Sequence, residues 1–390
     1  MKPKIAAEEP WVLYQNFVDE IFGKGVVVIK DLPSSCIIGT LKYLDDYIVF
    51  KDCFRRRLER LKLRFENTPS YPALLEQVKQ VADPNNWEGA YAELVAYDVM
   101  WNDCLVGGID LDVTLPASES FAGEMGQKAT NEDGHIDEYD LYFDVKILSD
   151  TVGAILAGIV DQAIAESSQS AHCSILPEYP LDDDDEDYSG ANRHKLFCEL
   201  KDFLISNNFR TSGKASCISK VLPQLTFRVQ WGDGVNTSIS GYDPYCHAKQ
   251  TRHLIFKRYT KKIMKNNTFM LVMVNFPWYN NKVNSFADAD WTYYRSLARR
   301  TFCAYKNDNT LMSSVVPKFQ GKETVYEVSR HLAGVIFIDD HSINEDSYSC
   351  HIVMNPNAVN PCPIMDSYMR SLVAGGDNRS IHDDLEYDNY

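Results

Sequence analysis

The chain has 390 residues, and 55 acidic against 39 basic side chains give it a formal charge of −16. Hydrophobic residues make up 45% and charged residues 24%, a composition typical of globular proteins that excludes wholesale disorder. The net acidity argues against a protein that coats nucleic acid non-specifically. The longest apolar stretch, residues 153–160, is too short to span a bilayer, and the N-terminus shows no secretory h-region. We therefore expect a soluble, cytoplasmic protein without membrane partners.

The first hundred residues are predicted to be mainly helical, with a short β-branched run at residues 26–29. Helices are expected over residues 11–22, 41–65, 71–81 and 87–103. An alternating strand is predicted at 109–115, an inserted loop at 117–133 and a hairpin at 135–148. The ten cysteines show no C-x-x-C or zinc-finger spacing, so we expect reduced thiols without disulfides or structural zinc.

The rest of the chain alternates between helices and strands. Helices are expected over residues 151–167 and 194–205, on either side of an acidic surface loop near 168–190. The later elements include a basic helix over 250–265 and strands over 224–231, 268–276, 334–339 and 350–354. The last fifteen or so residues are expected to be disordered. This mixture predicts an α+β (α/β) protein with a sheet core and surrounding helices.

The predicted strand at residues 142–148 carries two opposite charges on one face. Phe143, Val145 and Ile147 alternate onto a wholly apolar face, which indicates a buried core side. Asp144 and Lys146 share the other face. Two opposite charges are an unusual feature for the second face of a merely structural strand, so this face is a candidate for chemistry.

A second acid is expected opposite Asp144 in the hairpin. If Asp140 and Leu141 form a two-residue turn, Asp137 falls directly across from Asp144. Two carboxylates held that close repel each other unless a cation lies between them, and a divalent metal ion resolves the repulsion. The alternatives for this first acid are Asp112 and Asp110 on the preceding strand.

A third acid comes from the helix predicted at residues 87–103. Glu93 has Ala90 three residues before it, and Tyr97 and Met100 four and seven residues after it. It therefore shares an apolar stripe, where an unpaired carboxylate is costly. This placement favours a functional role for Glu93.

The order of helix acid, strand acid and acid-x-Lys on the next strand resembles the PD-(D/E)XK nuclease superfamily, which has the restriction-endonuclease-like fold. The matching residues are Glu93, Asp137, and Asp144 with Lys146, and the resemblance extends over roughly residues 85–275. It implies an αβββαβ core, completed by the helix after the hairpin and the strands at 224–231 and 268–276. Ile136 replaces the family's proline before the first Asp, and the gap from Asp137 to Asp144 is short.

The resemblance implies roles for these residues. Asp137, Asp144 and the Val145 carbonyl would hold Mg²⁺, for which Mn²⁺ would substitute, and Glu93 would orient a metal-bound water or help hold a second ion. Lys146 would stabilise negative charge on the phosphate oxygens. The implied reaction is hydrolysis of phosphodiester bonds in double-stranded DNA, and a restriction or antiviral defence role is a further analogy.

Six basic side chains on the helix predicted at residues 250–265 are candidates for contacts to the DNA backbone. They are Arg252, Lys257, Arg258, Lys261, Lys262 and Lys265. A solvated helix face is the alternative that the pattern leaves open. The acidic run at residues 182–187 would compete with DNA for these side chains if it folds back on them.

The expected organisation has four parts. Residues 1–82 form a mainly helical N-terminal region, 83–280 the nuclease-like core, 281–375 a C-terminal α/β extension and 376–390 a disordered acidic tail. Two alternative functions stay open: an RNA-cleaving nuclease of the same fold, and a non-catalytic scaffold whose acidic loop and tail contact a basic partner. A homodimer and a regulatory protein partner are also open.

Overall fold

The protein consists of two compact units. The computed structural model describes residues 10–29, 37–38, 48–104, 108–148, 151–167, 171–177, 190–207, 213–231, 236–239, 259–275, 294, 297–298, 302–303, 305–306, 308–362 and 379–382. Unit 1 comprises Met1–Leu148, His253–Trp278 and Thr301–Tyr390, and unit 2 comprises Ser149–Arg252 and Tyr279–Arg300. Unit 2 is therefore inserted into the chain of unit 1.

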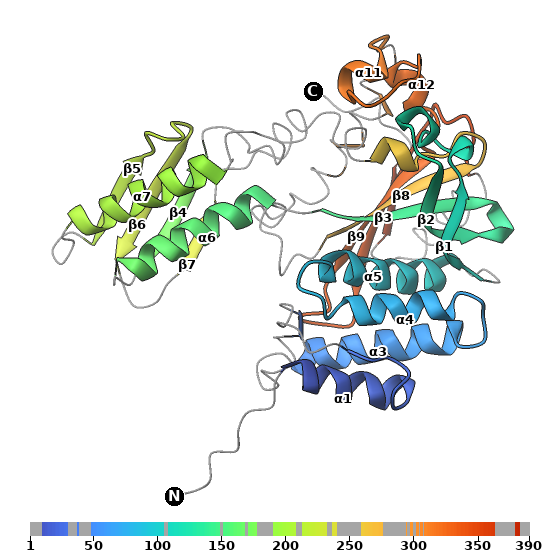
Figure 1. The fold of residues 1–390 in the computed structure, drawn as a ribbon, viewed down its shortest axis with the longest axis horizontal. Coiled ribbons are helices and arrows are strands. Elements are labelled where there is room, and N and C mark those ends of the chain that lie inside the picture. Colours follow the sequence, from blue (N-terminus) through green and yellow to red (C-terminus); the bar gives the residue numbers. More distant parts are fainter. Residues whose placement is uncertain are drawn as a thin grey trace, which may run out of the picture. The chain divides into compact units, whose positions relative to one another are not determined.

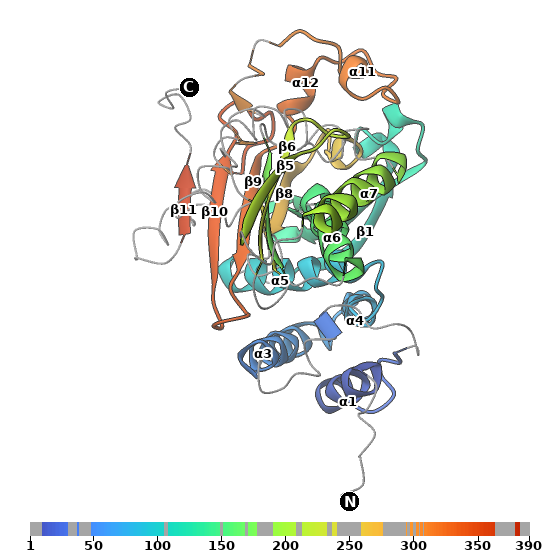
Figure 2. The ribbon, with the colours of Figure 1, turned by 90° about the vertical axis from the view of Figure 1, so that its left-hand side faces the viewer.

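Unit 1 is built on a seven-stranded mixed sheet in the order β1-β2-β3-β8-β9-β10-β11, of which Figure 1 labels the strands from β1 to β9 and Figure 2 also labels β10 and β11. Its strands are β1 (Asp110–Pro116), β2 (Ala129–Ile136), β3 (Leu141–Ile147), β8 (Thr268–Asn275), β9 (Gly334–Asp340), β10 (Tyr348–Met354) and β11 (Arg379–His382). The first three form an antiparallel meander, and β8 and β9 continue parallel to β3. β10 is antiparallel to β9, and β11 is parallel to β10. β8 and β9 are buried almost throughout, as expected for parallel strands covered on both faces.

A layer of helices covers one face of this sheet. Figures 1 and 2 show α5 next to the strands and α1 farthest from them. The helices are α1 (Pro10–Phe22), α3 (Ile48–Phe65), α4 (Tyr71–Gln80) and α5 (Trp87–Cys104). One hydrophobic core joins them to the sheet, because Leu94 and Tyr97 of α5 share a cluster with Phe143, Val145 and Val272. α5 is thus held directly against β3 and β8.

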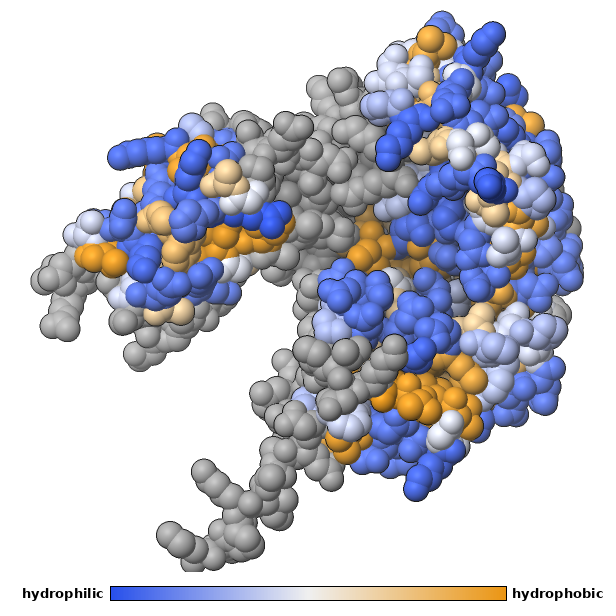
Figure 3. All heavy atoms as spheres, in the orientation of Figure 1, coloured by the Kyte–Doolittle hydropathy of each residue, from blue (hydrophilic) through white to orange (hydrophobic). Residues whose placement is uncertain are grey.

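The remaining elements of unit 1 are short. They are η1 (Ala117–Glu119), η2 (Gly123–Met125), η3 (Asp137–Tyr139), η5 (Thr260–Lys262), α11 (Met312–Val315) and α12 (Val325–Ser329). Figure 3 shows a mostly hydrophilic surface on this face of unit 1, with apolar residues gathered over α1, α3 and α4. In the part of the chain that the structure describes, no helix is both long and apolar enough to cross a membrane.

Unit 2 is a small α/β layer. Its four strands, in the order β5-β6-β4-β7, are β4 (Ala171–Pro177), β5 (Lys214–Ile218), β6 (Leu225–Trp231) and β7 (Asn236–Ile239). Its helices are α6 (Thr151–Glu166) and α7 (Gly190–Ser206), which pack on one face of this sheet (Figure 1). The core between them contains Leu156, Leu196, Ile175, Phe227 and Val229, all almost fully buried.

The α+β class expected from the sequence is confirmed, and most of the expected helices and strands are present. The domain boundaries differ from those expected. Residues 83–280 do not form one core, because the chain from Ser149 to Arg252 folds as part of unit 2. The strand predicted at 224–231 therefore belongs to the sheet of unit 2 and does not complete the sheet of unit 1.

Three segments expected to lack regular structure contain strands. The inserted loop at residues 117–133 ends in β2, the acidic segment begins with β4, and the tail contributes β11. The acids at 182–187 and the last eight residues lie outside the described residues. The prediction of a basic helix over residues 250–265 is also wrong where the structure describes this segment. After Tyr259 the chain forms only η5, and Met264 then pairs with Ser120 as a β-bridge.

Candidate active site

The site lies where β2 and β3 of unit 1 diverge. Their ladder pairs Ile136 with Leu141 and ends where Gly134 pairs with Phe143. Beyond Gly134 the backbones of the two strands no longer pair. Instead, the Oδ2 atom of Asp133 accepts a hydrogen bond of 2.6 Å from the Val145 N–H. A Cβ at Gly134 would lie 2.1 Å from the Phe143 ring, so only glycine permits this close approach. The divergence brings the Asp133 carboxylate beside β3.

Asp144 is the buried centre of the site. Its side chain is fully buried, with the Nζ of Lys146 2.5 Å from Oδ2 and the Nζ of Lys262 2.8 Å from Oδ1. Neither carboxylate oxygen accepts a hydrogen bond of good geometry. Lys146 also lies 3.7 Å from Oδ2 of Asp133, and Lys262 also donates to the Asn131 carbonyl. Two cations thus converge on one buried carboxylate.

Glu93 of α5 faces this cluster from the helical layer. Its Oε2 accepts a hydrogen bond of 2.9 Å from the Tyr97 hydroxyl, which also donates to the Asp133 carbonyl at 3.2 Å. Tyr97 is itself fixed by its edge contact with the Phe143 ring. Glu93 therefore lies among the apolar residues of α5, and the buried Tyr97 orients its carboxylate toward β2.

Two carboxyl groups of this site, those of Glu93 and Asp133, hold their protons unusually tightly. Burial, followed by the charge of Asp133, raises the pKa of Glu93 to about 8. Burial and the charge of Asp144 raise the pKa of Asp133 to about 7. Conversely, Asp144 and Asp133 outweigh the effect of burial on Lys146 and raise the pKa of its ammonium. The site therefore combines firmly charged cations with carboxyls that titrate near neutrality, a pattern common at functional sites.

Glu132 is a further buried acid beside the site. Its side chain is inaccessible to solvent, its Oε1 accepts a 2.6 Å hydrogen bond from Thr130, and its Oε2 has no hydrogen-bond partner. Burial raises the pKa of Glu132 to about 8, although Lys262 opposes the shift. In the unfolded chain the same carboxyl would titrate near its ordinary value of 4.5.

This shift makes a prediction for stability. The folded state binds one more proton than the unfolded state between pH 4.5 and about 8, so the stabilising contribution of Glu132 is lost as pH rises through that window, by about 1.4 kcal/mol per pH unit. In EDTA, Glu132→Gln is expected to gain stability relative to the wild type between pH 5 and pH 8. Melting by circular dichroism measures the gain, at about 2–4 °C per kcal/mol. Glu138→Gln, on exposed η3, is the control; an equal gain there would refute the burial argument.

Asp137 does not lie opposite Asp144. The strands pair four residues out of the expected register, since His135 and not Tyr139 pairs with Tyr142. The turn is the 3-10 helix η3, closed by Asp140 in the left-handed region at φ 45°, so Asp137 sits in the turn with its side chain 86% exposed. The alternative Asp112 is exposed and accepts a hydrogen bond from Asn131. Asp133 takes the place expected for Asp137.

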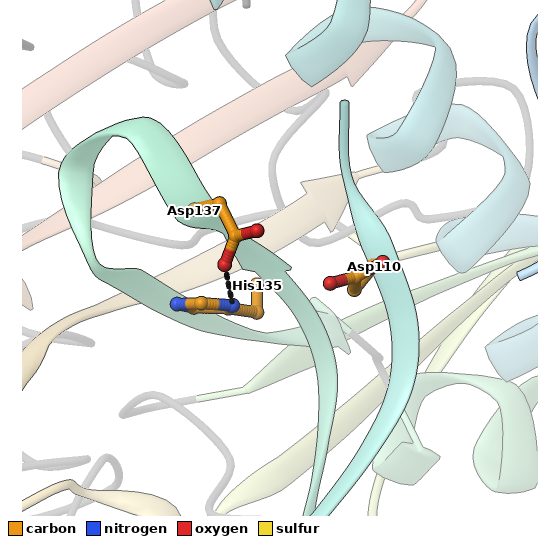
Figure 4. Close-up of side chains that lie close together, drawn as sticks. All are labelled: Asp110, His135 and Asp137. Atoms are coloured by element: carbon orange, nitrogen blue, oxygen red, sulfur yellow. Dashed lines mark ion pairs between the residues drawn. The ribbon is translucent and has the colours of Figure 1, made fainter. Parts of the chain in front are cut away.

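Asp137 belongs instead to a group of three side chains that could hold a metal ion. Asp110, His135 and Asp137 present ligand atoms that all lie within 4.8 Å of one another (Figure 4). The imidazole stacks on Tyr142 with ring centroids 4.0 Å apart, and its Nδ1 lies 3.3 Å from Asp137 Oδ1. Its Nε2 lies 3.4 Å from Asp140 Oδ1. Both aspartates are exposed at this site, unlike Asp144.

The basic candidates separate into three groups. Lys262 points into the site, whereas Lys265 pairs with Glu124 at 2.5 Å, so neither lies on a solvated helix face. Lys261 is half-buried on η5 and its carbonyl accepts a hydrogen bond from Ser120. Arg252, Lys257 and Arg258 lie outside the described residues. The expected DNA-binding helix is therefore not the element that these lysines form.

Asp133 is the site residue that sequence reasoning missed. Ten residues separate it from Asp144, a wider gap than the short one to Asp137. Its neighbour Gly134 and the following alternation of His135 and Ile136 are compatible with a strand that starts earlier. Comparison of the chain with protein-family models, curated proteins and solved structures finds no match. The geometry of the site therefore carries the functional argument by itself.

Proposed function

We propose that unit 1 is a metal-dependent nuclease of the PD-(D/E)XK type that hydrolyses phosphodiester bonds in DNA. The observation that carries the proposal is the meeting of Asp133 with Asp144 and Lys146 at the divergence of two strands, beside Glu93 of the covering helix. An acid, an acid-x-Lys pair and a helix glutamate are the kinds of residue on which the resemblance depended, with Asp133 in the place that the sequence had given to Asp137.

The arrangement of elements supports the same proposal. α5 is followed by the antiparallel meander β1-β2-β3, and β8 then lies parallel to β3 as the next strand of the sheet. This gives the helix, the three strands and the final strand of an αβββαβ core. The helix that follows β3 in sequence, α6, belongs to unit 2, and this is the departure from that pattern.

The donor set fits a hard divalent cation. Asp144 offers two buried oxygens that each contact a lysine ammonium but accept no well-directed hydrogen bond, and Glu132 offers a buried oxygen without any hydrogen bond. Oxygen donors are those that Mg²⁺ prefers, and Mn²⁺ tolerates the same set. Asp133, Asp144 and the Val145 carbonyl would hold the ion, with Glu93 at its edge. The ion would polarise the scissile phosphate and lower the pKa of an attacking water.

The chain's own residues supply the rest of the chemistry. Lys146 is 26% exposed and reaches from Asp144 toward Asp133, so its ammonium can contact a phosphate oxygen and offset the charge that builds on it. Lys262 fixes the other oxygen of Asp144. The Tyr97 hydroxyl holds the carboxyl of Glu93 in place, so this side chain can exchange a proton with a water at the site.

Cleavage of plasmid and short substrates tests the proposal. We expect the purified chain to cut duplex DNA in Mg²⁺ or Mn²⁺, and EDTA to stop the reaction. Single-stranded DNA and RNA are the parallel substrates, and a preference for RNA would reassign the substrate within the same mechanism. Absence of metal-dependent cleavage of all of them, with added Mg²⁺ giving no heat of binding, would favour the non-catalytic scaffold.

The two candidate metal sites make opposite predictions. If the buried cluster holds the catalytic ion, Asp144→Asn is expected to abolish cleavage and to weaken Mg²⁺ binding in calorimetry by at least tenfold. Asp137→Asn removes the same charge from the exposed group with Asp110 and His135, and should leave the rate within about twofold. The reverse result would move the active site to the exposed group.

A further inference from the structure

The sheet of unit 2 has one face covered by helices and one face that presents polar side chains. Cys173, Ile175, Phe227 and Val229 point into the core beneath α6 and α7. Because side chains alternate along a strand, their neighbours point to the opposite face. These neighbours are His172, Ser174, Lys214, Ser216, Arg228 and Gln230, and they line a hollow of about 350 Å³.

Strand pairing arranges the six side chains in two rows. Gln230 pairs with Lys214 on one side and with His172 on the other. Arg228 pairs in the same way with Ser216 and Ser174. The Cβ atoms of paired residues within a row are expected to lie about 4.5–5.5 Å apart, so hydrogen-bond donors are spread evenly across three strands. We call these six residues the polar face.

The polar face is positively charged although the protein is acidic. The four strands of unit 2 contain Lys214 and Arg228 and no aspartate or glutamate. The acids of unit 2's described helices lie on α6 and α7, which cover the other side. There Lys201 pairs with Glu166, whereas no ion pair among the described residues involves Lys214 or Arg228. The polar face thus carries two basic side chains and no acid, whereas α6 and α7 together carry four acids and three bases.

We propose that the polar face binds the phosphate backbone of a nucleic-acid duplex. Lysine, arginine, serine and glutamine side chains are the donors that contact phosphate oxygens, and the guanidinium of Arg228 can contact two oxygens at once. Single strands are held mainly by stacking of bases on aromatic rings. Among the described strand residues, Phe227 and Trp231 pack on the helical side, so the polar face presents no ring of Phe, Tyr or Trp. Backbone contact therefore dominates.

This site contains none of the residues of the proposed active site, and its binding does not require cleavage. It gives the inserted unit 2 a role that the catalytic residues of unit 1 do not supply, namely holding duplex nucleic acid without reading its sequence. Phosphate contacts position a duplex but carry no base information. The inference accordingly predicts affinity that depends on salt and hardly on sequence.

Fluorescence anisotropy of labelled duplexes tests the inference. The full chain carrying Lys146→Ala is titrated in EDTA with duplex DNA, duplex RNA and single-stranded DNA over a range of salt concentrations. Adding Lys214→Ala and Arg228→Ala is expected to weaken duplex binding at least tenfold. The slope of log K against log salt should fall by about 1.8 for two lost duplex contacts. The two duplex arms show whether DNA, RNA or both are held.

The matched control removes the same charges from the helical side. Arg193→Ala with Lys195→Ala changes two exposed residues of α7 and should leave affinity within twofold. Four results would each overturn the inference. They are equal losses of affinity in both double variants, an unchanged affinity in the polar-face variant, tighter binding of single strands than of duplexes, and no binding by the parent. The outcome is independent of the cleavage assay, so the failure of one proposal is distinguishable from the failure of the other.

Discussion

Lys146→Ala is expected to lower the rate of metal-dependent cleavage by about 10²–10³. The Nζ of Lys146 lies 2.5 Å from Asp144 Oδ2 and 3.7 Å from Asp133 Oδ2, and its side chain is partly open to solvent. It is thus the cation of the site that can reach a phosphate oxygen while staying tied to the two carboxylates. Asp144 keeps Lys262 as a counterion at 2.8 Å after the substitution, so the variant is expected to fold.

Separate measurement of rate and metal affinity distinguishes catalysis from structure. Removing a positive charge beside the carboxylates should leave Mg²⁺ affinity unchanged or tighter, while the single-turnover rate of plasmid nicking falls. Lys79→Ala serves as the control, because its pair with Glu76 is an exposed surface contact of little energetic value. Wild-type cleavage by Lys146→Ala would remove the lysine from the mechanism, and a parallel loss of melting temperature would point to a structural role.

The central part of the site was predictable because it depends on local alternation. Phe143 and Val145 occupy the core, and Asp144 and Lys146 lie together beside Asp133, as the period of two along a strand requires. Glu93 followed from the helical period in the same way. In both cases a residue's neighbours in sequence decide which way its side chain points.

The register of the hairpin was not predictable from the same pattern. β2 reads Ala129–Ile136 and contains Asn131, Glu132, Asp133 and Gly134, residue types that are depleted in strands. The connection is a 3-10 turn closed by Asp140 at a positive φ and not a two-residue turn. A shift of four residues preserves the alternation of faces, so the hydrophobic pattern could not separate the two registers.

Contacts between distant segments were the other limit. Lys262 contacts Asp144 although the segment Ser149–Arg252 of unit 2 separates the two residues in the sequence. Nothing in the sequence around Lys262 shows that it lies on a short 3-10 helix and not on the expected α-helix. The buried pair of Arg57 and Asp340 joins residues 283 positions apart. Such pairs follow from the packing of whole elements, which a reading of local periods does not supply.

Asp340→Ala is expected to lower the free energy of unfolding by about 3–5 kcal/mol, the largest effect on stability that we predict. Asp340 lies at the end of β9, fully buried, and its Oδ1 lies 2.8 Å from Arg57 of α3. Its Oδ2 accepts a 2.7 Å hydrogen bond from Tyr91 of α5, and Ser342 also donates to Oδ1. Burial would raise the pKa of Asp340, but Arg57 and these hydrogen bonds outweigh it and hold the pKa below its ordinary value. The carboxylate therefore stays charged, and removing it leaves the buried Arg57 without its main counterion.

The exposed counterpart of this pair provides the control. Asp346 lies 3.1 Å from Arg56 and 3.4 Å from Arg60, both on α3 and more exposed than Arg57, so Asp346→Ala is expected to cost no more than about 1 kcal/mol. Urea unfolding of both variants gives the comparison directly. Equal small losses would show that the buried pair contributes no more than a surface one.

Replacing both Arg57 and Asp340 by apolar residues tests whether the charged pair stabilises the fold more than apolar packing would. In Arg57→Met with Asp340→Leu, no uncompensated charge remains, and most of the stability lost in Asp340→Ala is expected to return. Tyr91, whose hydroxyl donates a hydrogen bond to Asp340, lies two residues before Glu93 on α5. If the charged network also fixes the position of this helix, the apolar double variant will regain stability while its cleavage rate stays below that of the wild type. Recovery of both would assign the network to stability alone, because the apolar pair would then hold Glu93 equally well.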